Sequence, residues 1–206
     1  MVQLLHYFEG KNQSVTLMEV LTGGELFKYI SSNEYRLTES KCRYFAREIL
    51  HAVKFMHDRR IIHLDLKPEN IILVQGQEST ERLKLIDFGL ARDLKDKDQI
   101  SINFCGTVEF IPPDVLRCSH ATFASDMWSI GVIFYMMLSG GLSPFFDGTE
   151  NGTIRAINRG RFVNGGYTHA NFNDISKSAI DCMANLLKLH PSKHTYTTRL
   201  GTSLYN

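Results

Sequence analysis

The sequence has 206 residues, of which 43% are hydrophobic, and its 23 basic and 22 acidic residues leave a net charge of +1. That length and apolar content suit a domain with a buried core, and the balanced charge argues against nucleic acid or an anionic membrane as the main partner. The four cysteines are scattered without a C-x-x-C or H-E-x-x-H pattern, which argues against structural zinc. We expect no membrane span and no secretory leader, and therefore a cytoplasmic protein.

The first half of the chain contains one predicted hairpin and one clear helix. Residues 2–8 and 15–20 are apolar runs separated by EGKNQS, a pattern that predicts a β-hairpin with a polar turn. The connector LTGGEL follows, and residues 25–31 are expected to form a short helix. Residues 38–57 predict a long helix with Thr38 as its N-cap. Its apolar stripe has helical spacing and consists of Cys42, Phe45, Ala46, Ile49, Leu50, Val53 and Met56.

The second half contains another predicted hairpin and two helices. Residues 71–74 and 83–86 are short β-branched runs joined by a polar stretch, which predicts paired strands. Residues 126–139 are apolar nearly all round, which predicts a helix buried on every side. Residues 176–189 predict an amphipathic helix, and the stretch after Pro191 loses its periodicity.

The loop HLDLKPEN, residues 63–70, places polar side chains between two apolar runs. Polar groups held against a core must find partners, because burial without partners is costly. Asp65, Lys67 and Asn70 therefore indicate a functional loop on a rigid support. Asp87 opens the sequence Asp-Phe-Gly seventeen residues after Asn70. Two carboxylates and an amide supply hard oxygen ligands of the kind that Mg²⁺ accepts together with waters and phosphate oxygens.

These motifs resemble the signature set of the eukaryotic protein kinases. H-x-D-L-K-x-x-N followed by D-F-G is a specific signal, and GGELFKYI, CGTVEFIPPDVL, SDMWSIGVIFYMMLSG and SPF stand in the family's order. The sequence is most similar to the calcium/calmodulin-dependent group, near the myosin light chain, death-associated and titin-like kinases, over about residues 1–194. The resemblance implies an α+β, protein-kinase-like fold that is mainly the helical C-lobe. Residues 1–22 would be a remnant of the N-lobe with the hinge, 23–194 the C-lobe, and 195–206 a tail outside the family pattern.

The resemblance also implies a role for each motif residue. Asp65 would accept the proton of a substrate Ser/Thr hydroxyl, Lys67 would contact the transferring phosphate, and Thr107 would connect the acceptor site to both. Asn70 and Asp87 would hold magnesium, so the implied cofactors are ATP and Mg²⁺. The implied nucleotide-side positions are Met18, Glu19, Leu21, Glu25 and Ile72.

Other positions carry expectations about substrate and structure. Glu25 and Glu69 match acidic family positions that favour a protein substrate with basic residues N-terminal to the Ser/Thr. For Asp126 two alternatives are open, a simple helix N-cap or a hydrogen bond to the backbone of the catalytic loop. His63 is expected to pack under Phe88.

The sequence departs from the family pattern at several points. It contains neither G-x-G-x-x-G nor V-A-I-K, so we expect a chain truncated at both ends and weak or inactive by itself. Leu64 replaces the Arg that usually pairs with a phosphorylated activation loop, so loop phosphorylation is expected to matter less. Asp114 and His194 are expected to form a weaker clamp than a Glu–Arg pair. Calmodulin or an autoinhibitory segment is expected only in a longer form. The alternative function is a non-catalytic scaffold or a dominant-negative, substrate-binding module.

Overall fold

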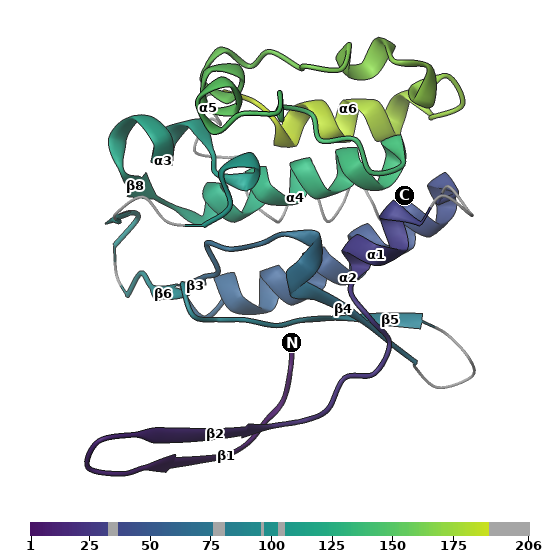
Figure 1. The fold of residues 1–206 in the computed structure, drawn as a ribbon. Coiled ribbons are helices and arrows are strands. Elements are labelled where there is room, and N and C mark those ends of the chain that lie inside the picture. Colours follow the sequence, from purple (N-terminus) through teal and green to yellow (C-terminus); the bar gives the residue numbers. More distant parts are fainter. Residues whose placement is uncertain (33–36, 76–80, 96, 103–105, 190–206) are drawn as a thin grey trace.

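The computed structural model describes residues 1–206 except 33–36, 76–80, 96, 103–105 and 190–206. A helical body forms most of the molecule, and a two-stranded hairpin projects from it (Figure 1). The predicted kinase-like arrangement of helices with small antiparallel sheets is confirmed. Within the described residues, no helix is long and apolar enough to cross a membrane.

The helical body is built around α4, Phe123–Ser139. All its residues from Ser125 to Ser139 are buried, as the apolar pattern predicts. Helices α2 (Glu39–His57) and α6 (Lys177–Leu186) pack against it. Gly131 permits the close approach of α6, because a Cβ at this position would lie only 2.8 Å from the Cβ of Leu186.

Helix α2 confirms the longest prediction made from periodicity. The hydroxyl of Thr38 accepts a hydrogen bond from the backbone N–H of Lys41 at 3.3 Å, and therefore caps the helix as predicted. Every residue of the predicted stripe is buried. His57 continues the stripe at the end of the helix and is also buried.

Helix α4 begins three residues earlier than predicted, so the N-cap alternative for Asp126 is wrong. Thr122 is the N-cap, because its hydroxyl accepts from the N–H of Ala124 while the Ser125 hydroxyl accepts from the N–H of Thr122. Asp126 instead lies inside the first turn and is fully buried.

The two predicted hairpins are present but differ in burial. Strands β4 (Ile71–Gln75) and β5 (Glu81–Leu85) pair antiparallel under the helices. Strands β1 (Leu4–Glu9) and β2 (Ser14–Met18) also pair, but every residue of both strands is exposed. An isolated two-stranded hairpin is marginally stable, and an uncovered apolar surface of this kind favours association. Its large apolar side chains, all roughly half exposed, are Leu4, Leu5, Tyr7, Phe8, Val15, Leu17 and Met18.

Short elements complete the body and connect its helices. The predicted helix over 25–31 is α1, and the helix predicted over 176–189 is the shorter α6, with Ser176 as its N-cap. His194 and the expected tail over 195–206 lie outside the described residues. The remaining elements are α1 (Leu26–Ser31), β3 (Ile61–Ile62), β6 (Arg92–Asp93), β7 (Ile100–Ser101), α3 (Pro113–Cys118), β8 (His120–Ala121), α5 (Glu150–Arg159) and the 3-10 turns Pro68–Asn70, Val108–Phe110, Gly166–Thr168 and Ala170–Phe172.

Candidate active site

The polar loop between β3 and β4 folds around the carboxylate of Asp65. The Nδ2 of Asn70 donates to the Oδ2 of Asp65 at 2.9 Å and to its backbone oxygen at 2.8 Å. The Nζ of Lys67 lies 3.0 Å from the same Oδ2. The side chain of Asp65 is only 10% exposed, so these contacts replace most of the water that a free carboxylate would bind.

Lys67 also connects this loop to a segment some forty residues later in the chain. Its Nζ donates to the Oγ1 of Thr107 at 3.2 Å, as the family resemblance implied. Gly106 makes this approach possible, because its φ of +97° is disfavoured for other residues. A Cβ there would also lie 3.3 Å from the backbone oxygen of Leu64.

The carboxylate of Asp126 binds the backbone of the catalytic loop, which is the second of the two roles that the sequence left open for it. Its Oδ2 accepts from the backbone N–H of His63 at 2.9 Å, and its Oδ1 accepts from the N–H of Leu64 at 3.0 Å. The Nε2 of His57 lies 2.7 Å from Oδ2. Complete burial opposes ionisation of this carboxyl, but the His57 contact and the two backbone N–H groups outweigh it and hold its pKa below the ordinary value of 3.8.

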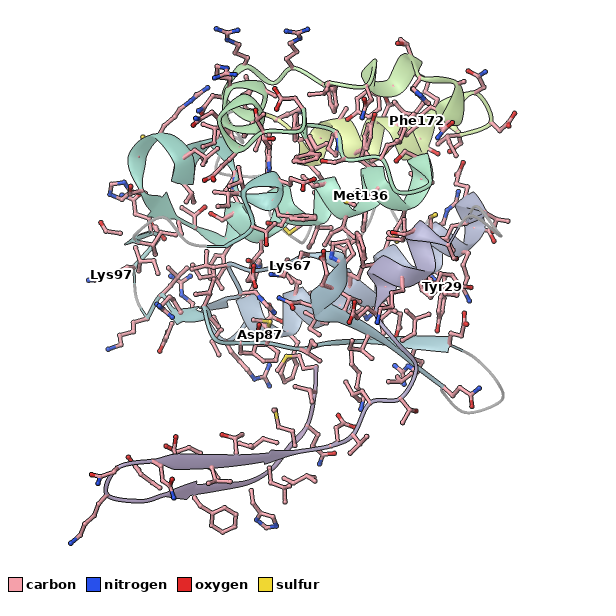
Figure 2. The ribbon with its side chains drawn as sticks, viewed as in Figure 1. Tyr29, Lys67, Asp87, Lys97, Met136 and Phe172 are labelled. Atoms are coloured by element: carbon pink, nitrogen blue, oxygen red, sulfur yellow. The ribbon has the colours of Figure 1, made fainter. Side chains whose placement is uncertain are left out.

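Asp87 lies next to the same loop because of strand pairing. The N–H of Ile86 donates to the backbone oxygen of Asn70 at 3.0 Å, which places the following residue, Asp87, beside Asn70. Figure 2 shows Lys67 within the body, below α4, and Asp87 nearer the side that faces the β1–β2 hairpin. Asp87 is exposed and has a φ of +58°. Its Oδ1 accepts from the N–H of Gly89 at 3.1 Å, which stabilises this uncommon conformation.

His63 has the packing role expected for it. Its ring centroid lies 5.1 Å from that of Phe88, and its Nε2 lies 3.3 Å from the backbone oxygen of Ile86. The imidazole is fully buried. His63 therefore supports the turn that carries Asp87.

The implied nucleotide-side positions fall into two groups. Ile72 is buried on β4, and Glu25 forms a β-bridge with it, so these two residues are neighbours. Met18 lies on the projecting hairpin and is 49% exposed, and Leu21 lies in the connector that follows. The structure therefore brings Glu25 and Ile72 together and leaves Met18 outside the packed body.

Glu19 connects the hairpin to the body through Lys84, a contact that sequence analysis missed. Lys84 lies opposite Ile72 in the β4–β5 register, and its Nζ is 2.6 Å from both carboxylate oxygens of Glu19. The carboxylate also accepts from the N–H of Gln3 at 2.7 Å. The Lys84 hydrogen bond, followed by that of Gln3, lowers the pKa of Glu19. The signal in the sequence was a lysine among the apolar residues of a predicted strand.

The oxygen donors of this site fit magnesium better than a transition metal. Asn70 uses its Nδ2 on Asp65, so its Oδ1 is the atom that can face a cation, and Asp87 adds a carboxylate. Mg²⁺ typically takes one or two protein oxygens and completes its shell with waters and phosphates. No cluster of three or more His, Cys, Asp or Glu side chains suited to a metal occurs among the described residues, so no all-protein cage is present in that part of the chain.

Comparison with known proteins agrees with this geometry. Residues 1–203 match the protein kinase domain family. The chain belongs to the protein kinase family. Myosin light chain kinase family member 4 from Homo sapiens is 42% identical to it over 187 residues, which are 91% of this chain and 46% of that protein.

Other kinases of the same kind are similarly related. Myosin light chain kinase 3 from Rattus norvegicus is 45% identical over 157 residues, covering 76% of this chain and 20% of that protein. The smooth muscle myosin light chain kinase from Gallus gallus is 40% identical over 188 residues, which are 91% of this chain and 10% of that protein. This kinase-family chain thus spans less than half the length of the relatives it matches, and its resemblance to the light-chain-kinase group is confirmed.

Proposed function

We propose that this kinase-family chain carries the phosphotransfer site of a serine/threonine protein kinase, which transfers the γ-phosphate of ATP to a protein hydroxyl. The observation that carries the proposal is the convergence on one carboxylate. Asp65 lies between the amide of Asn70 at 2.9 Å and the ammonium of Lys67 at 3.0 Å. Lys67 in turn contacts Thr107 on a separate segment at 3.2 Å.

Each proposed role follows from what these atoms can donate or accept. The two donors keep the Asp65 carboxylate fixed, and its remaining lone pairs can accept the proton of a substrate hydroxyl. Lys67 donates two of its three N–H groups to Asp65 and Thr107, so the third can bind a phosphate oxygen. Asn70 and Asp87 would hold Mg²⁺, which neutralises phosphate charge when bound. Phosphoryl transfer mostly requires positioning and charge, which these side chains supply.

We propose a protein substrate with a basic residue N-terminal to the phosphoacceptor. A cavity of about 290 Å³ lies beside Thr107, and Glu69 and Glu109 line it together with the aromatic rings of Phe27 and Phe146. The Oε2 of Glu69 is buried and has no hydrogen-bond partner among the described residues. An unpaired buried carboxylate oxygen costs free energy that a guanidinium or ammonium group would recover.

The proposed setting is the cytoplasm, and any calmodulin or autoinhibitory partner is proposed only for a longer form of the chain. The thiols of Cys118 and Cys182 are free, which suits a reducing compartment. The proposed nucleotide side consists of Met18, Glu19, Leu21, Glu25 and Ile72.

The test combines nucleotide binding with phosphotransfer under single-turnover conditions. We expect Mg²⁺-dependent binding of ATP that Asp87→Asn weakens, and slow transfer to an Arg-containing serine peptide that Asp65→Asn abolishes without weakening nucleotide binding. Glu69→Gln should raise the peptide KM for the Arg peptide but not for its Ala counterpart. The exposed Asp181→Asn, on α6, is the matched control for the carboxyl substitutions. Nucleotide binding that ignores both Mg²⁺ and Asp87 would contradict the proposal and favour the scaffold alternative.

A further inference from the structure

Arg60 occupies a left-handed turn between the end of α2 and strand β3. Its φ is +64°, and its N–H donates to the backbone oxygen of His57 at 2.9 Å. Its own backbone oxygen accepts from the N–H of Leu94 at 2.8 Å, next to the β3–β6 pairing of Ile61 with Asp93. The turn therefore aims the Arg60 side chain at the segment that follows β6.

The guanidinium of Arg60 binds two backbone carbonyls of that segment. Its Nε donates to the oxygen of Lys95 at 2.8 Å, and its Nη2 donates to the oxygen of Lys97 at 2.5 Å. Lys95 itself has a φ of +51°, so the segment turns at this point. Two carbonyls held by one rigid, planar fork are a geometry that lysine cannot reproduce. Figure 2 shows Lys97 at the edge of the molecule, beside the end of the fold that carries β6.

We call the two hydrogen bonds from the Arg60 guanidinium to the backbone oxygens of Lys95 and Lys97 the Arg60 clamp. A series of side-chain contacts connects this clamp to the catalytic loop. The guanidinium lies 5.0 Å from the ring centroid of Phe123, and that ring lies 4.6 Å from the ring of His57. His57 contacts Asp126 at 2.7 Å, and Asp126 binds the backbone of His63 and Leu64, directly before Asp65. The contacts of Arg60 therefore reach the loop through the partly buried ring of Phe123 and then through His57 and Asp126, which are both buried.

Leu64 removes the alternative of anchoring this segment through a phosphate. A leucine cannot pair with a phosphate, and this side chain packs instead against an apolar cluster that includes Ile62 and Leu94. We propose that Arg60 is a positioning residue that holds the segment after Asp87-Phe88-Gly89 against the catalytic loop through backbone carbonyls, so that its position does not depend on a phosphate. The consequence for peptide phosphorylation rests on the proposed function, whereas the clamp itself does not.

Limited digestion with a lysine-specific endoprotease tests the clamp directly, because the carbonyls that Arg60 binds belong to the bonds cleaved after Lys95 and Lys97. Arg60→Asn and Arg60→Gly remove the fork while tolerating the positive φ. We expect cleavage of these two bonds to accelerate at least about tenfold, because the variants lose two hydrogen bonds from a charged donor and cleavage follows the population of the opened segment.

The matched control is Arg59→Asn, since the Arg59 guanidinium lies on the ring of Phe55 at 3.5 Å and bonds the Phe55 oxygen instead. Cleavage after Lys54, within α2, reports global unfolding and should not change in any variant. Equal rates after Lys95 and Lys97 in wild type, Arg59→Asn and both Arg60 variants would overturn the clamp.

A kinetic measurement then tests the positioning role. We expect the Arg60 variants to raise the KM for the peptide several-fold while leaving the affinity for Mg²⁺-ATP unchanged, because the clamped segment leads toward Thr107 and not toward the nucleotide side. Faster proteolysis with an unchanged peptide KM would refute the positioning role. If the wild-type chain transfers no phosphate, the proposed function fails. The digestion still shows whether Arg60 holds the segment at Lys95 and Lys97.

Discussion

Replacing Asp126 by Asn should destabilise the protein although the two side chains have nearly the same shape. Both carboxylate oxygens accept backbone N–H groups, Oδ2 from His63 at 2.9 Å and Oδ1 from Leu64 at 3.0 Å. The Asn side chain has one acceptor oxygen, so its NH₂ group must face one of these N–H donors. A buried N–H left without an acceptor costs about 1–3 kcal/mol, and the remaining bonds lose the benefit of a charged acceptor, about 1 kcal/mol more. We expect a total loss of about 3 kcal/mol.

Urea unfolding followed by circular dichroism measures this loss. With a slope of about 2–3 kcal/mol per molar, the expected shift of the unfolding midpoint is roughly 1 M. The control is Asp181→Asn, because Asp181 is exposed on α6 and should change stability by no more than about 0.5 kcal/mol. A shift for Asp126→Asn as small as that of the control would refute the conclusion that this carboxylate determines the position of the catalytic loop.

The stability of the wild type and that of Asp126→Asn should also depend differently on pH in the acid range. The folded-state pKa of Asp126 is depressed below its ordinary value of 3.8. Its ionised form therefore contributes stability that is fully present above about pH 4 and is lost as the pH falls through the folded-state pKa. Asp126→Asn lacks this contribution. The difference in stability between wild type and variant should therefore shrink below about pH 4 in urea titrations.

Three further predictions concern the packing of the helical body. Gly131→Ala should lower the melting temperature. The overpacking cost against α6, about 1–3 kcal/mol, exceeds the gain in helix propensity of about 1 kcal/mol. A higher melting temperature would contradict the close packing of α4 and α6. Gly23→Ala should destabilise the protein more than Gly10→Ala in urea, because a Cβ at Gly23 would overlap the backbone oxygen of β4, whereas the nearest atom to a Cβ at Gly10 is 3.2 Å away. Burial raises the pKa of Cys182 to about 11. This thiol should therefore react with a disulfide reagent at pH 8 at least about tenfold more slowly than the exposed thiol of Cys118. Equal reaction rates would contradict the burial of Cys182.

The periodic helices could be predicted because their pattern is a local property of the sequence. The stripe in α2 and the all-round apolar α4 identify their buried faces without knowledge of their partners. Helix α5, Glu150–Arg159, escaped prediction although its boundaries are marked. Thr149 caps its start through a bond from the N–H of Gly152, and Gly160 ends it with a φ of +61°. A search for cap residues would have found a helix that a search for long apolar patterns did not.

The residues of the candidate site were predictable, and the family resemblance also implied some of their contacts, such as Lys67 with Thr107 and Asp126 with the loop backbone. The motif spacing identified Asp65, Lys67 and Asn70 together, and the loop does bring them within hydrogen-bonding distance. Contacts such as Lys84 with Glu19 and Arg60 with two backbone carbonyls depend on register and on a turn, and a carbonyl oxygen carries no signature in the sequence. These contacts required the folded chain.

The two sides of the site rest on different kinds of support, and this difference has a measurable consequence. The catalytic loop is held by the fully buried Asp126, whose hydrogen bonds salt screens only weakly. The hairpin that carries Met18 is joined to the body largely by the Glu19–Lys84 pair, with 22% and 31% of the two side chains exposed, and by one backbone bond from Val2 to Leu85 at 2.8 Å. A part-exposed pair of this kind contributes little to stability and is weakened by salt. Raising the ionic strength should therefore accelerate hydrogen exchange at the backbone N–H of Val2 and leave the N–H of His63 unchanged. Equal acceleration at both positions would show that the loop and the hairpin open as one unit.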